Sequence, residues 1–469
     1  MIRAPLSLLA NWLSCAPVMR DVEVRGVSTD SRRLQPGNLF VALKGTNFDG
    51  HDHLQQAAEK GAVAAVVSTR NDAVNLPQLV VPNTLQALQT LGVCWRGRVN
   101  PTVIGITGSA GKTTVKQLLA ALFAQVGPTR ATVGNLNNEI GVPLTLLSLA
   151  DTDQFAVIEL GANHVGEIAR LTTLARPDFA VVTMAGSAHV GEFGSVDAIV
   201  QAKGELYVGL APTAQALINL DSYGAEYWMA HTAAPWAGFA LKGCPLAHLA
   251  RWLGEYDART ATLTIFEAGQ MILSCCPLPL PGAHNAVNVL AAVAVARAYG
   301  LDAAVIAAGL KAFSPPMGRM GLIALEETIA LIDDTYNANP ESMRAALDYL
   351  VSRPGVRVAV LGDMGELGAQ SASLHQALGD HARSLPLDAV FTLGEAMLDL
   401  VARCSLPTTS CVSRACVTPE EITALLSPYL AQSRQSGTPL TILFKGSRFM
   451  QMERVMRLLQ SQNQTEGAL

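Results

Sequence analysis

The sequence predicts an α/β protein with three domains and parallel β-sheets, and three observations carry this prediction. The chain has 469 residues, and domains average about 150 residues. Half of the residues are hydrophobic and only 15% are charged, which is typical of large cores whose parallel strands are apolar on both faces. In the last third of the chain, apolar runs ending in Gly or Asp alternate with helical stretches, as expected for βαβ units.

Two breaks divide the chain into residues 1–98, 99–314 and 315–469. The polar segment 96–102, "RGRVNPT", contains Asn-Pro, a pair that marks a turn or loop. The segment 312–319, "AFSPPMGR", has two adjacent prolines and cannot continue a helix. The first part carries short strand-like runs and turns, and the second begins with a strand, a loop and a helix. We therefore expect one domain in each part.

The third part alternates most clearly between strands and helices. Its predicted strands are "IALIDD", "VRVAVLGD", "DAVFTLG" and "LTILFKG", and its predicted helices are "PESMRAALDYL", "LHQALGDHA", "EAMLDLVARC" and "RFMQMERVMRLL". The alternation predicts a parallel sheet with ligands beyond the carboxyl ends of its strands. Because the G-x-G-x-x-G of dinucleotide-binding domains is missing, we do not expect NAD.

Charge and cysteine content disfavour several kinds of partner and location. The net charge is −5, without a run of several adjacent Lys or Arg, so nothing favours nucleic acid or an acidic membrane. The eight cysteines form no CxxC pair or zinc-like spacing, which suits a reducing cytosol. The apolar run 286–296 is too short to span a bilayer. The first residues, interrupted by Pro5 and Asn11, predict an amphipathic helix rather than a signal peptide. We expect a cytoplasmic monomer.

The segment "GITGSAGKTT", residues 105–114, has the composition of a phosphate-binding loop without the usual spacing. That spacing needs a glycine five residues before Gly111, where this chain has Ile106. The flanking residues still predict the right context, because a β-branched run precedes the loop and an apolar helical stripe follows it. The stripe consists of Val115, Leu118, Leu119, Leu122 and Phe123. A strand, a glycine loop and a helix N-terminus together bind phosphate.

Lys112 and Thr113 carry the chemistry of this loop. In phosphate-binding loops the lysine reaches the β- and γ-phosphates, and the hydroxyl holds Mg²⁺. The alternative is a glycine turn with an exposed lysine, which the flanking strand and helix disfavour. The loop therefore predicts ATP and Mg²⁺ as cofactors.

Three later residues are candidates for the same site. Glu159 ends the apolar run "FAVIE" one βα unit after the loop, where an acid can ligate or orient Mg²⁺; elsewhere such an acid is a solvated loop charge. His189 lies in a Gly/Ser-rich loop after the next apolar run and is a candidate metal ligand or phosphate contact. Lys203 lies about one turn into a helix, and its spacing alone favours an ordinary surface lysine.

Nine short motifs are spread along the chain. They are "TGSAGKTT", "NNEIGVPLTLL", "IELGANHVGEI", "AHVGEFGS", "AKGEL", "PGAHNAVN", "DDTYNANPESM", "VLGDMGELG" and "FKGSR". In this order they resemble the Mur ligase family, from about Val27 to Met456. The segment "STDSRRLQPGNLFVALKGTNFDGHDH" is similar to the uridine-diphosphate-binding domain shared by the members that add the third residue and the D-alanyl-D-alanine dipeptide. "DDTYNANPESM" and "LGDMGELG" favour the dipeptide-adding member.

This resemblance implies a reaction and a role for each domain. The reaction would be ATP-dependent ligation of D-alanyl-D-alanine to UDP-N-acetylmuramoyl-tripeptide through an acyl phosphate. The small N-terminal domain would bind the UDP-sugar, the central P-loop-type parallel-sheet domain would bind ATP, and the C-terminal domain would be Rossmann-like. The alternatives are the third-residue ligase, a folylpolyglutamate synthase, which should lack the UDP-binding domain, and a non-catalytic nucleotide-binding protein, which would not need Glu159, His189 and Lys203.

The resemblance also implies roles for individual residues. Lys112, Glu159, His189 and Lys203 match the catalytic residues of the family. Lys203 matches a lysine that is carbamylated into a metal ligand, which reverses the surface position favoured by its spacing. The metal positions are matched by Thr113, Glu159, His189 and Lys203. The ATP-binding positions are matched by Gly108, Ser109, Ala110, Gly111, Lys112, Thr113, Thr114, Asn285, Asn288, Arg319, Asp334, Tyr336 and Asn339. The UDP-sugar positions are matched by Ser31, Arg32, Lys44, Thr46, Asp49 and His51.

Overall fold

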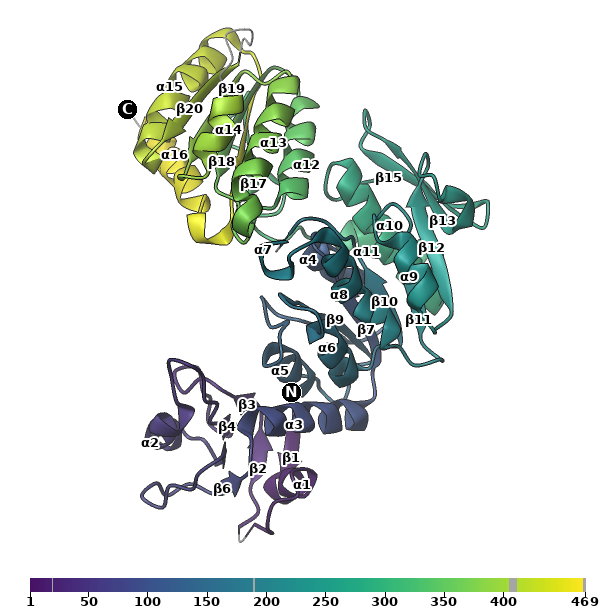
Figure 1. Cartoon of the computed structure of the whole chain (residues 1–469), viewed down its shortest axis with the longest axis vertical. Coiled ribbons are helices and arrows are strands. Elements are labelled where there is room, and N and C mark those ends of the chain that lie inside the picture. Colours follow the sequence, from purple (N-terminus) through teal and green to yellow (C-terminus); the bar gives the residue numbers. More distant parts are fainter. Residues whose placement is uncertain (19, 189, 405–410, 467–469) are drawn as a thin grey trace.

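The computed structural model describes residues 1–18, 20–188, 190–404 and 411–466 and forms three α/β domains. Figure 1 shows them in a row, with the N-terminal domain in purple, the middle domain in teal and the C-terminal domain in green and yellow. Each of the three contains a parallel or mainly parallel sheet. The predicted fold class is therefore confirmed. Within the described ranges, no helix is both long and apolar enough to cross a bilayer.

The N-terminal domain contains a four-stranded parallel sheet in the order β3-β4-β5-β6 and a separate antiparallel pair, β1-β2. Its strands are β1 (Arg3–Pro5), β2 (Glu23–Arg25), β3 (Val27–Ser28), β4 (Leu39–Val41), β5 (Ala64–Val67) and β6 (Gln78–Val80). Its helices are α1 (Leu6–Trp12), η1 (Gly50–His53), α2 (Leu54–Glu59) and α3 (Thr84–Val99). The predicted first helix is α1, which buries Leu6, Leu9 and Ala10.

Helix α3 connects the N-terminal and middle domains. The Asn83 side chain caps its start by accepting from the Gln86 N–H, and Asn100, in the left-handed conformation, ends it before Pro101. Trp95 is completely buried, and its ring N–H donates to the Leu149 carbonyl at 2.9 Å. The last two turns of α3 are therefore packed against the middle domain.

The middle domain is built on a nine-stranded sheet in the order β15-β14-β13-β12-β11-β10-β7-β9-β8. Neighbours from β8 to β13 run parallel, whereas β14 and β15 add antiparallel pairs at one edge. The strands are β7 (Thr102–Thr107), β8 (Thr129–Ala131), β9 (Phe155–Glu159), β10 (Phe179–Val182), β11 (Gln215–Asn219), β12 (Trp236–Leu241), β13 (Ala250–Asp257), β14 (Thr262–Glu267) and β15 (Gln270–Pro277). The helices are α4 (Lys112–Phe123), α5 (Gly141–Leu147), α6 (Glu167–Ala175), α7 (Val190–Phe193), α8 (Val196–Val208), α9 (Ala225–His231), η2 (Ala247–Leu249), α10 (Ala283–Tyr299) and α11 (Ala303–Ala312).

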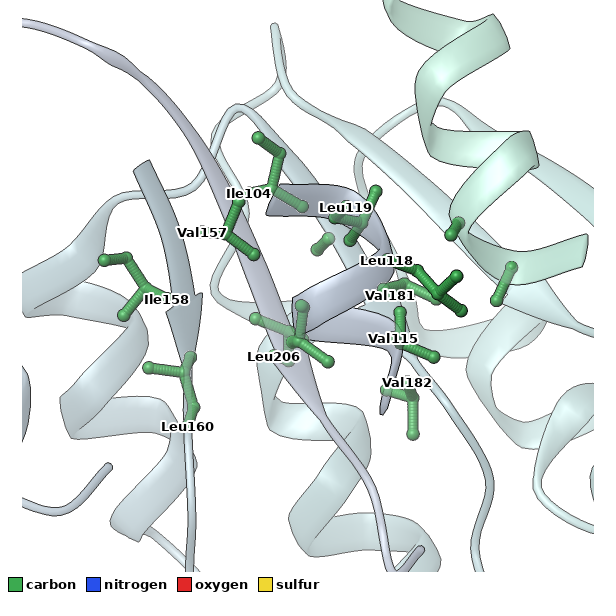
Figure 2. Close-up of a cluster of buried hydrophobic side chains, with 14 of the residues drawn as sticks. Ile104, Val115, Leu118, Leu119, Val157, Ile158, Leu160, Val181, Val182 and Leu206 are labelled. Atoms are coloured by element: carbon green, nitrogen blue, oxygen red, sulfur yellow. The ribbon is translucent and has the colours of Figure 1, made fainter. Parts of the chain in front are cut away.

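The core of the middle domain holds the strand that precedes the glycine loop and the helix that follows it. The predicted apolar stripe of α4 is confirmed, because all five of its residues are buried. Figure 2 shows Val115, Leu118 and Leu119 of this helix among Ile104, Val157 and Val181 of the central strands. Burial of such a side chain contributes about 1.5–3 kcal/mol. This packing fixes the strand β7 and the helix α4, between which the glycine loop lies.

The C-terminal domain has a six-stranded sheet in the order β16-β17-β21-β18-β19-β20, in which only the β16-β17 pair is antiparallel. The strands are β16 (Gly321–Ala324), β17 (Ile329–Asp334), β18 (Val356–Gly362), β19 (Ala389–Leu393), β20 (Val412–Cys416) and β21 (Leu440–Lys445). The helices are α12 (Pro340–Val351), η3 (Gly368–Gln370), α13 (Ser371–Ser384), α14 (Met397–Cys404), α15 (Pro419–Ser436), η4 (Arg448–Met450) and α16 (Glu453–Glu466). The four predicted strands are confirmed as β17, β18, β19 and β21.

Candidate functional site

A cavity of about 940 Å³ opens between the middle and C-terminal domains. It lies at the carboxyl ends of β7, β9 and β10, where parallel sheets bind ligands. The glycine loop forms one wall, and segments that follow β17, β18 and β21 form the facing wall. Figure 1 shows α7 at the junction of the two domains. The cavity is therefore built from residues more than 300 positions apart in the sequence.

The glycine loop requires glycine at two positions. Gly108 has a φ of +145°, and a Cβ there would lie 2.0 Å from the Thr183 hydroxyl oxygen. Gly111 has a φ of +80°, and a Cβ there would lie 2.4 Å from the Asn288 side-chain oxygen. Gly111 also precedes the first residue of α4. Ile106 belongs to the buried strand β7, which explains why the usual spacing fails although the loop joins a strand to a helix N-terminus.

Polar groups of the loop are held by the loop itself and by the segment after β10. The Ser109 hydroxyl accepts from the Gly186 N–H at 3.0 Å. Lys112 Nζ donates to the Gly108 carbonyl at 2.6 Å, so its side chain folds back over the loop. Burial lowers the pKa of Lys112, and Glu159 opposes that effect. The loop thus places a cation where a helix N-terminus also favours anions.

Glu159 ends β9 and is only 3% exposed. One oxygen accepts from the Thr113 hydroxyl at 3.2 Å and lies 3.1 Å from Lys116 Nζ. The other accepts from the Asn137 amide at 3.0 Å. Burial alone would raise the pKa of Glu159, but Lys116 and Lys112 hold it below its usual value. The strand-end position predicted for Glu159 beside the loop is confirmed.

Lys116 and Asn137 were not predicted as site residues. Lys116 stands one helical turn after Lys112 in "KTTVK", and this i, i+4 spacing is the signal that placed both lysines on one face. Asn137 belongs to the motif "NNEIG", in which Glu139 is the only charged residue. Its contact with Glu159 depends on how the segment after β8 folds, so sequence spacing could not reveal it.

Lys203 is buried, and the surface position favoured by its spacing is wrong. The residue is 2% exposed on α8, and its Nζ donates to the Ala162 carbonyl at 3.2 Å. Nζ also lies 5.1 Å from the centre of the Phe193 ring. Burial and, to a smaller extent, the charge of Lys112 together lower the pKa of Lys203 to about 7. About half of the amine is therefore neutral near pH 7, whereas an ordinary lysine is almost fully charged there. His189, predicted as its neighbour at the metal, lies outside the described residues.

The C-terminal domain contributes charged and aromatic groups to the cavity. Arg319 donates to the Thr113 hydroxyl at 3.0 Å, and its guanidinium lies 4.3 Å from the centre of the Tyr336 ring. Asp334 accepts from Lys445 Nζ at 2.5 Å and from the Met320 N–H at 3.2 Å. Arg319, Tyr336 and Asp334 all line the cavity. Lys445, in the motif "FKGSR", was given no role from the sequence.

Asn339 also lines the cavity but has a structural task. Its side chain accepts from the Ser342 N–H at 2.8 Å and caps α12, whose first residue is Pro340. Glu341, in the first turn of α12, accepts from the Ser187 N–H at 2.7 Å and from its hydroxyl at 2.8 Å. Glu341 was not predicted as a site residue. This contact joins α12 to the segment after β10 and thus links the two domains.

The first turn of α10 forms another side of the cavity. The Asn288 amide donates to the Asn285 side-chain oxygen at 3.1 Å, and the Asn285 amide donates to the Pro281 carbonyl at 2.8 Å. His284, half-buried beside them, has its pKa lowered to about 4, chiefly by burial. The predicted ATP-binding residues Asn285 and Asn288 therefore lie in the same cavity as the loop.

The six predicted UDP-sugar residues lie in the N-terminal domain, and none of them lines that cavity. Asp49 lies 2.6 Å from His51 Nδ1 and 3.3 Å from Lys44 Nζ. Hydrogen bonds from His51 lower the pKa of Asp49 to about 2. His51 Nε2 accepts from the Ser68 N–H at 2.9 Å. These contacts hold the turn that exposes Thr46.

Ser31 and Arg32 lie on the segment before β4. The Ser31 hydroxyl donates to Gln56 at 2.6 Å, and the exposed Arg32 forms a two-point ion pair with Asp30. That ion pair lowers the pKa of Asp30 to about 2. The structure gives both residues partners within their own domain.

The oxygen atoms beside the glycine loop suit a Mg²⁺ ion that is bound by only a few protein ligands. Within the described ranges, no group of three His, Cys, Asp or Glu side chains gathers in a way that could hold a metal. Mg²⁺, however, is usually bound through one or two carboxylates together with substrate phosphates and water. The Glu159 carboxylate and the Thr113 hydroxyl are oxygen donors 3.2 Å apart on the cavity wall. This arrangement suits an ion that arrives with a nucleotide.

Family models match most of the chain. The Mur ligase middle domain matches residues 106–296, the glutamate ligase domain of Mur ligases matches residues 318–448, and the catalytic domain of the Mur ligase family matches residues 23–92. Over 98% of its length the chain is 39% identical to the UDP-N-acetylmuramoyl-tripeptide–D-alanyl-D-alanine ligase of Escherichia coli K12, of which it covers 99%.

Solved structures of similar proteins share the whole architecture. MurF from Acinetobacter baumannii superposes with a TM-score of 0.88 at 33% identity, covering 98% of this chain and 100% of that one. MurF ligase from Thermotoga maritima, solved in complex with ADP, superposes with a TM-score of 0.81 at 26% identity, covering 94% and 99%. The likeness therefore extends over all three domains.

Proposed function

The chain belongs to the Mur ligase family, and we propose that it joins D-alanyl-D-alanine to UDP-N-acetylmuramoyl-tripeptide in an ATP-dependent reaction. The observation that carries the proposal is the 39% identity over 98% of the chain to a ligase with that activity in its name. The cavity supports it, because the loop, Glu159 and Arg319 converge on one space. An N-terminal domain with matched UDP-sugar positions supports it against a folylpolyglutamate synthase.

The proposed reaction has two steps. A free carboxylate is a poor acyl donor, because its leaving group would be oxide. Transfer of the γ-phosphoryl group of ATP to the terminal carboxylate of the tripeptide gives an acyl phosphate and ADP. The amine of D-alanyl-D-alanine then attacks the acyl carbon, loses a proton and expels phosphate, giving the pentapeptide. Both steps build negative charge, which Lys112 and Arg319 lie in the cavity to offset.

Thr113 and Glu159 are the described residues that would hold Mg²⁺, with His189 and carbamylated Lys203 as further ligands. When bound, Mg²⁺ supplies positive charge to the phosphate oxygens. Carbamylation of Lys203 forms an N–C bond between its neutral amine and CO₂ and releases one proton. The pKa of about 7 makes that neutral amine available near neutral pH. The modification also replaces a buried cation by an anion that suits a divalent ion.

The remaining assignments follow from the same family. We propose that Ser31, Arg32, Lys44, Thr46, Asp49 and His51 contact the UDP-sugar, and that residues 1–98, 99–314 and 315–469 are the functional domains. A monomer in the cytoplasm is expected, and its eight cysteines are all free thiols in this structure. Size-exclusion chromatography with light scattering would measure the mass, for which the sequence gives 49.4 kDa for one chain.

A substrate-exchange assay tests the proposal. Phosphate release is measured with UDP-N-acetylmuramoyl-tripeptide and D-alanyl-D-alanine, supplied together and singly, and the pentapeptide is identified by mass spectrometry. Full turnover should require both. Comparing turnover with UDP-tripeptides that carry diaminopimelate or lysine identifies which third residue the enzyme accepts. Full turnover with UDP-N-acetylmuramoyl-dipeptide and one amino acid would instead identify the third-residue ligase, and ATP binding without phosphate release under any pairing would favour a non-catalytic protein.

A further inference from the structure

A buried ion pair stands directly behind the proposed metal site. Lys116 lies one turn after Lys112 on α4, and its side chain is 1% exposed. Its Nζ lies 3.1 Å from an oxygen of Glu159, whose side chain is 4% exposed. Lys112 and Glu159 both line the cavity, whereas Lys116 does not. Lys116 therefore reaches the cavity only through Glu159.

The Glu159 carboxylate is held by protein donors at both oxygens. Asn137 donates to one oxygen, and Thr113 and Lys116 approach the other. The backbone N–H of Glu159 also donates to the Thr132 hydroxyl at 3.0 Å. A carboxylate offers about four acceptor sites, so three donors leave one for a ligand that enters from the cavity. The donors thus determine which side of the carboxylate faces the nucleotide.

Lys116 is the cation that compensates the buried charge of Glu159. Removing one partner of a buried ion pair is strongly unfavourable, because the other charge remains without compensation. Lys112 cannot replace it in this geometry, because its Nζ donates to the Gly108 carbonyl and the side chain lies over the loop. Thr113 and Asn137 are neutral. The two lysines of α4 therefore have different roles: Lys112 lies over the glycine loop, and Lys116 pairs with Glu159.

We propose that Lys116 is a positioning residue, which orients the Glu159 carboxylate from behind so that it can bind the metal ion; the inference rests on the proposed function. Lys116 contacts neither the nucleotide nor the metal. It acts as an outer-shell partner of a metal ligand. Loss of such a partner typically lowers metal affinity about 10- to 100-fold.

Mn²⁺ binding in the presence of ADP, followed by the electron paramagnetic resonance signal of the free ion, tests this role. Lys116→Met should weaken Mn²⁺ binding about 10- to 100-fold, and Lys116→Arg should restore part of the affinity because it keeps the charge. Leu118→Met, a buried substitution on the same helix, should leave Mn²⁺ binding unchanged. In turnover assays, Lys116→Met should raise the Mg²⁺ concentration for half-maximal rate but not the KM for UDP-tripeptide.

Equal or tighter Mn²⁺ binding by Lys116→Met would overturn the inference. Lys116 would then not help Glu159 to bind the metal, and at most it would compete with the metal for the Glu159 carboxylate. Absence of Mn²⁺ binding by the wild-type protein would instead contradict the proposed metal site itself.

Thermal unfolding without metal tests the ion pair even if the Lys116→Met variant folds poorly. The Lys116→Met and Glu159→Gln variants should each lower the unfolding midpoint, and the double variant should regain part of the loss. Simple additivity of the two losses would also overturn the inference.

Discussion

Arg319 donates to the Thr113 hydroxyl at 3.0 Å and thereby connects the start of the C-terminal domain to the first turn of α4. The two residues are 206 positions apart in the sequence. Tyr336 supports the guanidinium from one side, with 4.3 Å between the guanidinium carbon and the ring centre. The contact places a fixed cation at the loop only when the two domains are together, so one side chain couples the position of the C-terminal domain to charge compensation at the phosphates.

Replacing Arg319 by Ala should therefore weaken ATP use with little effect on folding. We expect at least a tenfold loss of kcat/KM for ATP, consistent with about 1.5–3 kcal/mol for a hydrogen bond to a charged group. Arg319→Lys should recover only part of it, because lysine lacks the planar fork that stacks on Tyr336. Steady-state kinetics with varied ATP measures both. Unchanged kcat/KM in Arg319→Ala would show that the contact has no role in turnover.

Replacing Lys112 by Ala should abolish phosphate release and leave UDP-sugar binding intact. The reason is that Lys112 belongs to the cavity between the middle and C-terminal domains, whereas the predicted UDP-sugar residues lie in the N-terminal domain. Phosphate release and isothermal titration with UDP-N-acetylmuramoyl-tripeptide measure the two effects separately. Normal turnover in this variant would contradict the assignment of the glycine loop to ATP.

Replacing Lys203 by Ala should give a nearly inactive enzyme that short-chain carboxylic acids partly restore. The substitution removes a buried amine with a pKa of about 7 and leaves space beside the Ala162 carbonyl. A small carboxylate can occupy that space and supply the oxygens that a carbamate would supply. Turnover with increasing acetate or propionate measures the rescue, and Lys112→Ala under the same acids serves as the control. If Lys203 is only structural, no acid will restore activity.

Local sequence pattern predicted those parts of the molecule that are determined by nearby residues. The stripe from Val115 to Phe123 is buried as its helical spacing required, and the run "IALIDD" is β17 from end to end. The edge strands β16 and β20 were not predicted, because half-exposed strands such as Val412–Cys416 lack a continuous apolar run. The helix α15 was also not predicted.

The site was less predictable than the fold, because its contacts join distant segments. Spacing alone placed Lys203 on a surface, yet packing buries it against Phe193 and against Ala162, which lies 41 positions away in the sequence. The contacts of Lys116 with Glu159 and of Glu341 with Ser187 cross 43 and 154 positions, beyond the reach of any local periodicity. The domain boundaries and the ATP and UDP-sugar contacts of individual residues stay predictions.

His284 should make the folded protein sensitive to mild acid. Burial lowers its pKa to about 4, while Asp334 and Asp348 oppose the shift and Lys445 adds to it. In the unfolded chain the pKa is about 6.5. Between these two values the unfolded chain binds more protons than the folded protein, so the free energy of unfolding falls as the pH decreases through this window. Well above pH 6.5 the residue is neutral in both states and contributes no pH dependence.

Thermal unfolding of wild-type protein and His284→Gln at pH 7.5 and pH 5 measures this effect. The wild type should lose about 2 kcal/mol relative to the variant between these pH values, since each pKa unit corresponds to about 1.4 kcal/mol. His248→Gln removes an exposed histidine and should follow the wild type. If His284→Gln loses as much stability in acid as the wild type, the folded protein accepts a proton on His284 without a cost in stability. The lowered pKa of His284 would then be contradicted.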